Sequence, residues 1–200
     1  MRQSRPWFLL FAMILLLSGC LGRGKSDVTY YTLLNMNELG ETQAVASFPD
    51  VKLGVGPITI ADSLKRNQIA TRENGYQFKF NEFQRWAGVL EKDLSFVLGD
   101  NLGTLLGTEM VTFFPWTHGK PDYRIVVDVA RLDGTLGGEA VFVARWGVAG
   151  KDLEVTLAAG KSEYRIDLAD TSYDTLVKAE SQLLVKLSQE IAAEIVKLKK

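Results

Sequence analysis

The chain has 200 residues, of which 46% are hydrophobic and 24% charged, a composition typical of one packed globular domain and not of a disordered chain. Its 23 basic residues are balanced by 24 acidic ones, so no overall positive field is available to hold nucleic acid phosphates. One cysteine and one histidine exclude an internal disulfide and an ordinary Cys/His zinc site. We therefore expect no nucleic acid partner and no metal centre.

The N-terminal residues have the pattern of an export signal. A basic segment, residues 1–6, precedes an unbroken apolar run over residues 7–17, and two small residues follow. The uncharged stretch, residues 6–22, is at the short limit for a membrane-spanning helix, which needs roughly 20 residues. The pattern favours cleavage over a permanent transmembrane span.

The segment Leu17-Ser18-Gly19-Cys20 resembles the lipobox of bacterial lipoproteins. The resemblance implies that residues 1–19 are a signal peptide and that a lipid is attached to the Cys20 thiol. Two or more acyl chains would give durable membrane anchoring. The alternative is a chance cysteine at the end of an apolar run. Because residue 21 is Leu and not Asp, similarity to the enterobacterial sorting pattern implies the periplasmic face of the outer membrane.

After the lipobox, residues 20–27 are polar and rich in glycine, which is typical of a short lipidated tether. Residues 28–200 are expected to form a single domain. Its first elements read as strands, over Val28–Leu34 and Val51–Ile60, with a bend or a sheet edge at Gly56-Pro57. Asn74-Gly75 then predicts a type I′ hairpin between residues 69–73 and 76–80.

The next segment changes to a helical period. Apolar residues recur at three and four positions from Phe83 to Leu105 and include Trp86, so we expect a long helix over 82–106 with Trp86 in the core. Asn81 is a plausible N-cap and Gly107 a plausible stop.

A strand-rich region follows this helix. The strands are expected over residues 110–114, 123–130, 140–148, 153–157 and 164–168, with a turn over 134–139. The tail, residues 171–200, returns to the helical period and either packs on the domain's own sheet or is offered to a partner. This order indicates an α+β fold, a mixed, largely antiparallel sheet with two long amphipathic helices on one face.

Residues that could carry chemistry are few. His118 is the only histidine that could act as a catalytic base, and it lies in a turn-like stretch. Gly54-Val55-Gly56 lacks the third glycine of a dinucleotide-binding fingerprint. Three aspartates, Asp122, Asp128 and Asp133, fall at strand ends and solvent positions without pairing as acid and base. We expect no catalytic residues and no cofactor.

One aromatic cluster remains as a contact candidate. The run Phe113-Phe114-Pro115-Trp116 ends a strand and enters a loop, where it either caps the core or forms an exposed contact patch. Phe114, Pro115 and Trp116 are therefore the candidate partner contacts.

Several weak motifs occur in order along the mature chain, over residues 30–33, 53–60, 66–72, 85–87, 114–116 and 122–123. Together they resemble the PqiC family, the auxiliary lipoproteins of ABC-type and MCE-type transport systems. The Asp62-Ser63-Leu64-Lys65 segment is more polar than its usual counterpart in that family.

The resemblance implies a non-enzymatic subunit of an intermembrane lipid transport complex that supports envelope integrity. Its partner would be a periplasmic MCE-domain protein with associated inner-membrane components, and the lipoprotein would dock that conduit to the outer membrane. A homo-oligomer is compatible with this role, although no residue identifies one. The alternatives are a stand-alone periplasmic lipoprotein that binds a small molecule or peptidoglycan, and an envelope hydrolase that uses Ser or Asp residues.

Overall fold

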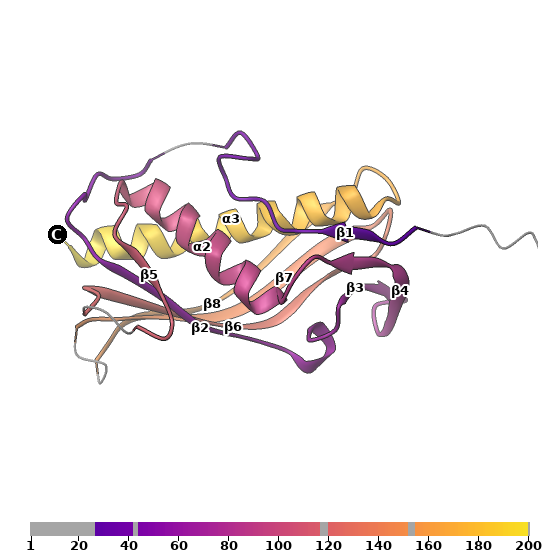
Figure 1. Cartoon of the computed structure of the whole chain (residues 1–200), viewed down its shortest axis with the longest axis horizontal. Coiled ribbons are helices and arrows are strands. Elements are labelled where there is room, and N and C mark those ends of the chain that lie inside the picture. The colour runs from indigo at the N-terminus through magenta and orange to yellow at the C-terminus, as the bar shows by residue number, and fades with distance from the viewer. Residues whose placement is uncertain (1–26, 42–43, 117–119, 152–154, 200) are drawn as a thin grey trace, which may run out of the picture.

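The computed structural model describes residues 27–41, 44–116, 120–151 and 155–199. Within these ranges the chain forms strands, two long helices and one short 3-10 turn, arranged as the α+β fold that the sequence predicts (Figure 1). The elements are β1 (Thr29–Tyr31), β2 (Leu53–Ile60), η2 (Asp62–Leu64), β3 (Gln68–Glu73), β4 (Gln77–Trp86), α2 (Leu90–Leu106), β5 (Val111–Phe113), β6 (Tyr123–Gly134), β7 (Glu139–Ala149), β8 (Thr156–Asp167) and α3 (Tyr173–Leu198).

The long strand β6 organises the sheet. Along one side it pairs with antiparallel β7, which in turn pairs with antiparallel β8. Along its other side it pairs first with parallel β2 and then, at Gly134, with Thr71 of β3. Strand β5 adds to β2, and β4 and β1 add to β3. The result is a mixed sheet with three antiparallel pairs among the described strands, β3–β4, β6–β7 and β7–β8.

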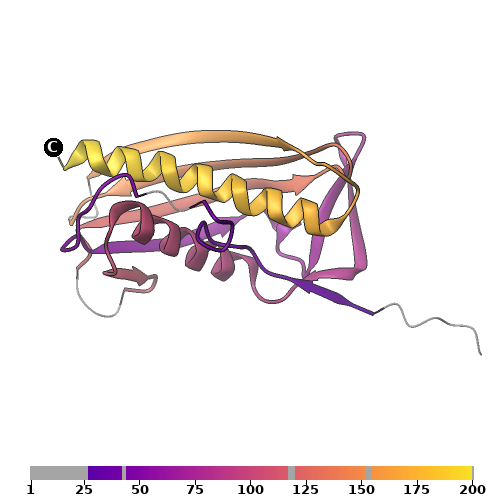
Figure 2. The ribbon, with the colours of Figure 1, turned by 90° about the horizontal axis from the view of Figure 1, so that it is seen from above.

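Both helices cover one face of this sheet (Figures 1 and 2). The apolar residues of the helices recur every three or four positions and face the sheet. Alternate residues of β6 face the helices and pack against them. The predicted amphipathic helices are thus confirmed as the cover of the core. Fully buried examples are Leu98 and Leu102 of α2, Leu187 and Ile191 of α3, and Ile125 of β6.

The other face of the sheet is open over most of its area. Val126, Asp128 and Ala130 of β6 alternate with the buried residues and are exposed on this open face. Among the described residues, no helix is long and apolar enough to cross a membrane.

The start of α2 differs from the sequence prediction. Residues 82–86, expected in the helix, continue β4, and α2 begins at Leu90 behind Val89, which makes no side-chain cap bond. Asn81 is therefore not an N-cap, and its side-chain oxygen accepts a hydrogen bond from the Phe83 amide inside the strand. Pairing of this segment with both β1 and β3 satisfies more backbone groups than a free helical turn would, so it overrides the local period. Trp86 is buried as predicted, but on a strand.

Other boundaries confirm or refine the prediction. Asn74 and Gly75 both adopt positive φ, as the hairpin requires, although the loop also takes in Tyr76 because Glu73 pairs with Gln77. Gly107 ends α2 in the left-handed conformation. The two short strands expected over 153–157 and 164–168 are one continuous β8, apart from residues 152–154, which lie outside the described ranges.

Candidate functional site

An aromatic groove opens where β2, α2 and β5 meet. Its volume is about 400 Å³, and it lies beside Phe96 of α2 and Phe114, which follows β5. Both of these side chains are more than half exposed, at 52% and 53%. We use the name aromatic groove for the set Gly56, Pro57, Ile58, Glu91, Lys92, Ser95, Phe96, Phe113 and Phe114.

Ring contacts hold the groove's shape. The Phe96 and Phe113 rings meet edge to face, with centroids 4.8 Å apart and an interplanar angle of 72°. Phe113 can approach α2 this closely because position 99 is glycine: a Cβ there would lie 2.6 Å from the Phe113 ring. The groove wall is therefore built into the packing of β5 on α2.

The floor of the groove comes from an irregularity in β2. The register of β2 against β6 shifts between Val55 and Ile58, and Gly56 adopts a φ of 104° that a residue with a side chain rarely takes. The Phe114 amide donates to the Val55 carbonyl, which places the Phe114 side chain beside Pro57. The sequence prediction of a bend at Gly56-Pro57 is confirmed.

Trp116 turns to the opposite face of the sheet from the helices. Its indole ring meets the Phe114 ring edge to face, with centroids 5.3 Å apart, and the Arg124 guanidinium lies 5.3 Å from its centroid. Gly54 leaves room for this ring, since a Cβ there would lie 2.7 Å from the indole Nε1. Trp116 is half-buried, whereas Phe114 and Pro115 are exposed. The cluster is therefore divided: Phe113 packs against the core, Trp116 is half-buried on the open face, and Phe114 is exposed to solvent.

A second, more polar cavity of about 630 Å³ lies against the C-terminal half of α2. Its lining includes Asn35, Asn37, Asp100 and Glu109, and glycines of α2 form its wall. No group of three or more His, Cys, Asp or Glu side chains that could hold a metal ion occurs in the part of the chain that the structure describes.

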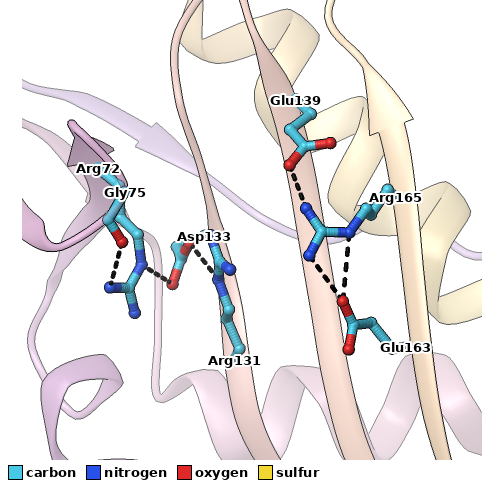
Figure 3. Close-up of polar contacts among 7 residues, drawn as sticks. All are labelled: Arg72, Gly75, Arg131, Asp133, Glu139, Glu163 and Arg165. Atoms are coloured by element: carbon cyan, nitrogen blue, oxygen red, sulfur yellow. Dashed lines mark hydrogen bonds and ion pairs between the residues drawn. The ribbon is translucent and has the colours of Figure 1, made fainter.

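Two buried carboxyl groups lie outside both cavities. Asp133 of β6, 1% exposed, accepts from the Nε atoms of Arg72 and Arg131, each at 2.9 Å (Figure 3). Glu180 of α3 is fully buried, and neither of its carboxyl oxygens has a hydrogen-bond partner within the described ranges. Burial, with a smaller contribution from the charge of Asp133, raises the pKa of the Glu180 carboxyl well above its ordinary value. Neither group pairs with a nucleophile or base in an arrangement typical of catalysis.

Several residues singled out in the sequence lie outside the described ranges, namely the lipobox residues 17–20 and His118. Of the three predicted contacts, only Phe114 lines the groove, and sequence reasoning did not propose Pro57, Phe96 or the other residues of α2 and β2 as contacts. Phe96 did carry a signal: it stands off the apolar stripe of its helix, next to the buried positions Leu94 and Val97, so its ring had to face something other than the core.

Comparison with known proteins agrees with this architecture. One solved structure, described only as an uncharacterized protein, is 21% identical, has a TM-score of 0.69 and aligns over 84% of this chain and 99% of its own. The protein XCC0632 from Xanthomonas campestris, of the DUF330 family, is 16% identical with a TM-score of 0.65, over 82% of this chain and 93% of its own. A search of curated proteins found no match.

These two likenesses support the fold alone, but the sequence also matches a family model. The model, described as ABC-type transport auxiliary lipoprotein component, matches residues 31–192, which is most of the chain. This match confirms the family resemblance noted in the sequence. The chain therefore belongs to the family of ABC-type transport auxiliary lipoprotein components.

Proposed function

We propose that the protein is a non-enzymatic lipoprotein, anchored through Cys20 to the periplasmic face of the outer membrane, that docks the periplasmic conduit of an MCE/ABC-type lipid transport complex. The observation that carries the docking part is the aromatic groove, where Phe96 and Phe114 remain more than half exposed on an otherwise well-packed domain. Exposed aromatic side chains that line a concave surface are typical anchors of protein interfaces.

The anchor explains why a modest docking surface suffices. A lipid on Cys20 would confine the domain to a surface, which raises its local concentration for a partner that arrives from the other membrane. The groove then needs to supply only the specific contacts. Phe114 and Pro115 would contact the partner directly, and Trp116 would hold their loop on the sheet.

A pull-down of the full lipidated protein from detergent-extracted membranes tests the docking surface. The variant Phe96→Ser/Phe114→Ser should recover an MCE-domain partner at least about tenfold less than the wild type, since single buried aromatic anchors contribute about 2 kcal/mol. Tyr76→Ser is the matched control because Tyr76 is 73% exposed at the hairpin tip, away from the groove. Equal recovery of the partner by the wild type, the double variant and the control would show that the groove is not part of the interface.

The anchor has its own test, independent of the groove. Cys20→Ser should leave the domain folded but release it from membranes, and an unchanged membrane fraction would contradict lipid anchoring. Leu21→Asp should shift the protein to the inner membrane if the sorting analogy holds. Outer-membrane recovery of Leu21→Asp would defeat that analogy without affecting the anchor itself.

The polar cavity favours a second candidate function, a stand-alone lipoprotein that binds a small molecule or peptidoglycan. Its volume of about 630 Å³ is within the range of ligand sites, and its lining offers amide, hydroxyl and carboxylate groups. Co-purification separates the two functions. A stable complex with an MCE protein supports docking, whereas a monomer that retains a ligand and loses it on Asp100→Leu supports the alternative.

A further inference from the structure

The outer edge of β8 is long and unpaired. This strand runs over twelve residues and pairs with β7 alone among the described strands. Figure 2 shows β8 at the margin of the sheet, with α3 beside it on the helix face and the outer side of the strand uncovered. A row of free backbone amide and carbonyl groups of this length is a template for another strand.

The charges beside this edge are arranged unfavourably within one chain. On the open face, Lys161 of β8 lies directly opposite Arg145 of β7, and six residues further along Asp167 lies directly opposite Glu139. Like charges directly opposite each other on adjacent strands are destabilising. Neither Lys161 nor Asp167 forms an ion pair with another described residue, and both are exposed. The edge therefore carries an exposed cation at one end and an exposed anion at the other, while the residues opposite them on β7 have their own partners, Asp128 for Arg145 and Arg165 for Glu139.

We propose that β8 pairs antiparallel with β8 of a second copy, about a two-fold axis that passes beside Tyr164. Such an axis, perpendicular to the sheet, places each residue a fixed number of positions before Tyr164 opposite the residue the same number after it. Lys161 then faces Asp167 of the second copy, and Glu163 faces Arg165 of the second copy. The two sheets become one continuous sheet, with all four helices on the same face.

This register is selected by charge and by side-chain direction. An axis beside Glu163 would set Glu163 opposite itself and Lys161 opposite Arg165, and an axis beside Arg165 would set Arg165 opposite itself. A shift by a single residue would place an open-face side chain opposite a helix-face one, which a perpendicular two-fold axis forbids. The alternating charges thus disfavour these neighbouring registers while fitting a second copy of the same strand centred on Tyr164.

The residues at the axis are held in place before pairing. Arg165 already bonds to Glu139 and to Glu163 on the open face (Figure 3), so its guanidinium is positioned between strands. On the helix face the Tyr164 ring stacks on Phe142 at 6.5 Å between centroids, and its hydroxyl donates to the Glu190 carboxylate. Two half-buried tyrosines would therefore meet across the axis as a cross-strand aromatic pair.

Sedimentation equilibrium of the full lipidated protein in detergent tests the proposal. The wild type should be dimeric. Lys161→Glu should weaken the dimer about tenfold or more, since it replaces two symmetric attractive cross-strand pairs by repulsive ones. The same substitution places an acid opposite Arg145 of its own chain, so its thermal unfolding midpoint should not fall. Loss of the dimer therefore cannot be attributed to loss of the fold.

A second substitution should restore what the first removes. Asp167→Lys alone should also weaken the dimer, whereas Lys161→Glu/Asp167→Lys should regain wild-type association, because each new acid then faces a new cation of the second copy. A monomeric wild type, a larger assembly that these changes do not affect, or a double variant no better than the single ones would overturn the proposal. If β8 pairs with a different protein and not with itself, the purified wild type would be monomeric.

Cysteine cross-linking in isolated membranes checks the position of the axis. Tyr164→Cys should give a disulfide-linked dimer under mild oxidation because the two residues are directly opposite each other. Leu157→Cys, on the same strand and more exposed than residue 164, should not, since residue 157 of the second copy would be about 45 Å away at 3.3 Å per residue. The wild type, with only Cys20, is the background control. Equal cross-linking at both positions would contradict the register.

Discussion

The two faces of the sheet treat a buried carboxyl group in opposite ways. On the open face, Asp133 is withdrawn from water but receives Nε–H bonds from two arginines, whose long side chains reach it from β3 and from its own strand (Figure 3). On the side covered by α3, Glu180 is withdrawn just as completely and has no hydrogen-bond partner within the described chain. An open face leaves room for long cations to fold back over an acid, whereas a tightly packed helix leaves none. Burial without a partner therefore favours the neutral form of Glu180 and raises the pKa of its carboxyl group.

The largest loss of stability should come from removing Asp133, the buried acid that is paired with two arginines. Asp133→Ala leaves Arg72 and Arg131 close together without an acceptor, and removing one partner from a buried ion pair costs about 3 kcal/mol or more in free energy of unfolding. Urea denaturation should show this loss with an unchanged m-value. Asp62→Ala, which removes the acid of a fully exposed ion pair with Lys65, should leave the midpoint nearly unaltered. Similar midpoints for the two variants would refute the comparison.

Replacing Glu180, the buried acid without a hydrogen-bond partner in the described chain, should instead increase the free energy of unfolding. In the folded protein the pKa of the Glu180 carboxyl is raised above its ordinary value of 4.5. As the pH rises above 4.5, the unfolded chain therefore releases this proton before the folded chain does. Its contribution to stability is therefore fully present below pH 4.5 and is lost as pH rises towards the folded-state pKa. Glu180→Gln should raise the free energy of unfolding at pH 7, because the neutral amide has no proton to release when the chain unfolds.

The pH dependence sharpens that prediction. The advantage of Glu180→Gln over the wild type should shrink as the pH falls to 4.5, when both states of the wild type hold the proton. Glu194→Gln, on the same helix but partly exposed beside Lys197, serves as the control and should show no such trend. A constant advantage at all pH values would mean that packing, and not protonation, separates the two proteins.

The smallest effect concerns a third acid that does find donors under the helix. Glu190 accepts from the hydroxyls of Ser162 and Tyr164, so Tyr164→Phe should cost about 1 kcal/mol while keeping the ring stacked on Phe142. Burial and the bond to Glu190 raise the pKa of Tyr164 to about 12. An absorbance titration should therefore show one tyrosine that ionises well above pH 10 in the wild type and is missing in Tyr164→Phe.

Much of the fold could be predicted from local pattern, and the errors occur where distant strands decide. The helical stripe identified the body of α2, and Asn74-Gly75 identified the hairpin, because these signals depend on neighbours along the chain. The segment from Phe83 to Trp86 has the same period but pairs with strands from residues 29–31 and 68, which no local window contains. Long-range pairing was therefore the information that the sequence pattern lacked.

The candidate site was predictable only in part. Phe114, Pro115 and Trp116 were conspicuous as an aromatic run at a strand end, and the structure places two of them in solvent. Pro57 and Phe96 precede Phe114 by 57 and 18 residues in the sequence, and only the packing of β2 and β5 against α2 brings them together. The charges on β8 could be compared with their neighbours only once the register of β8 against β7 was known.

The placement of β1 has a mechanical consequence. This strand is the first described element and runs parallel to the end of β4 (Figure 1). A force applied to the N-terminal end of β1 along the strand would load the β1–β4 hydrogen bonds in shear, all at once, and not peel them apart one after another. A seam of only three residue pairs would resist force best in that direction.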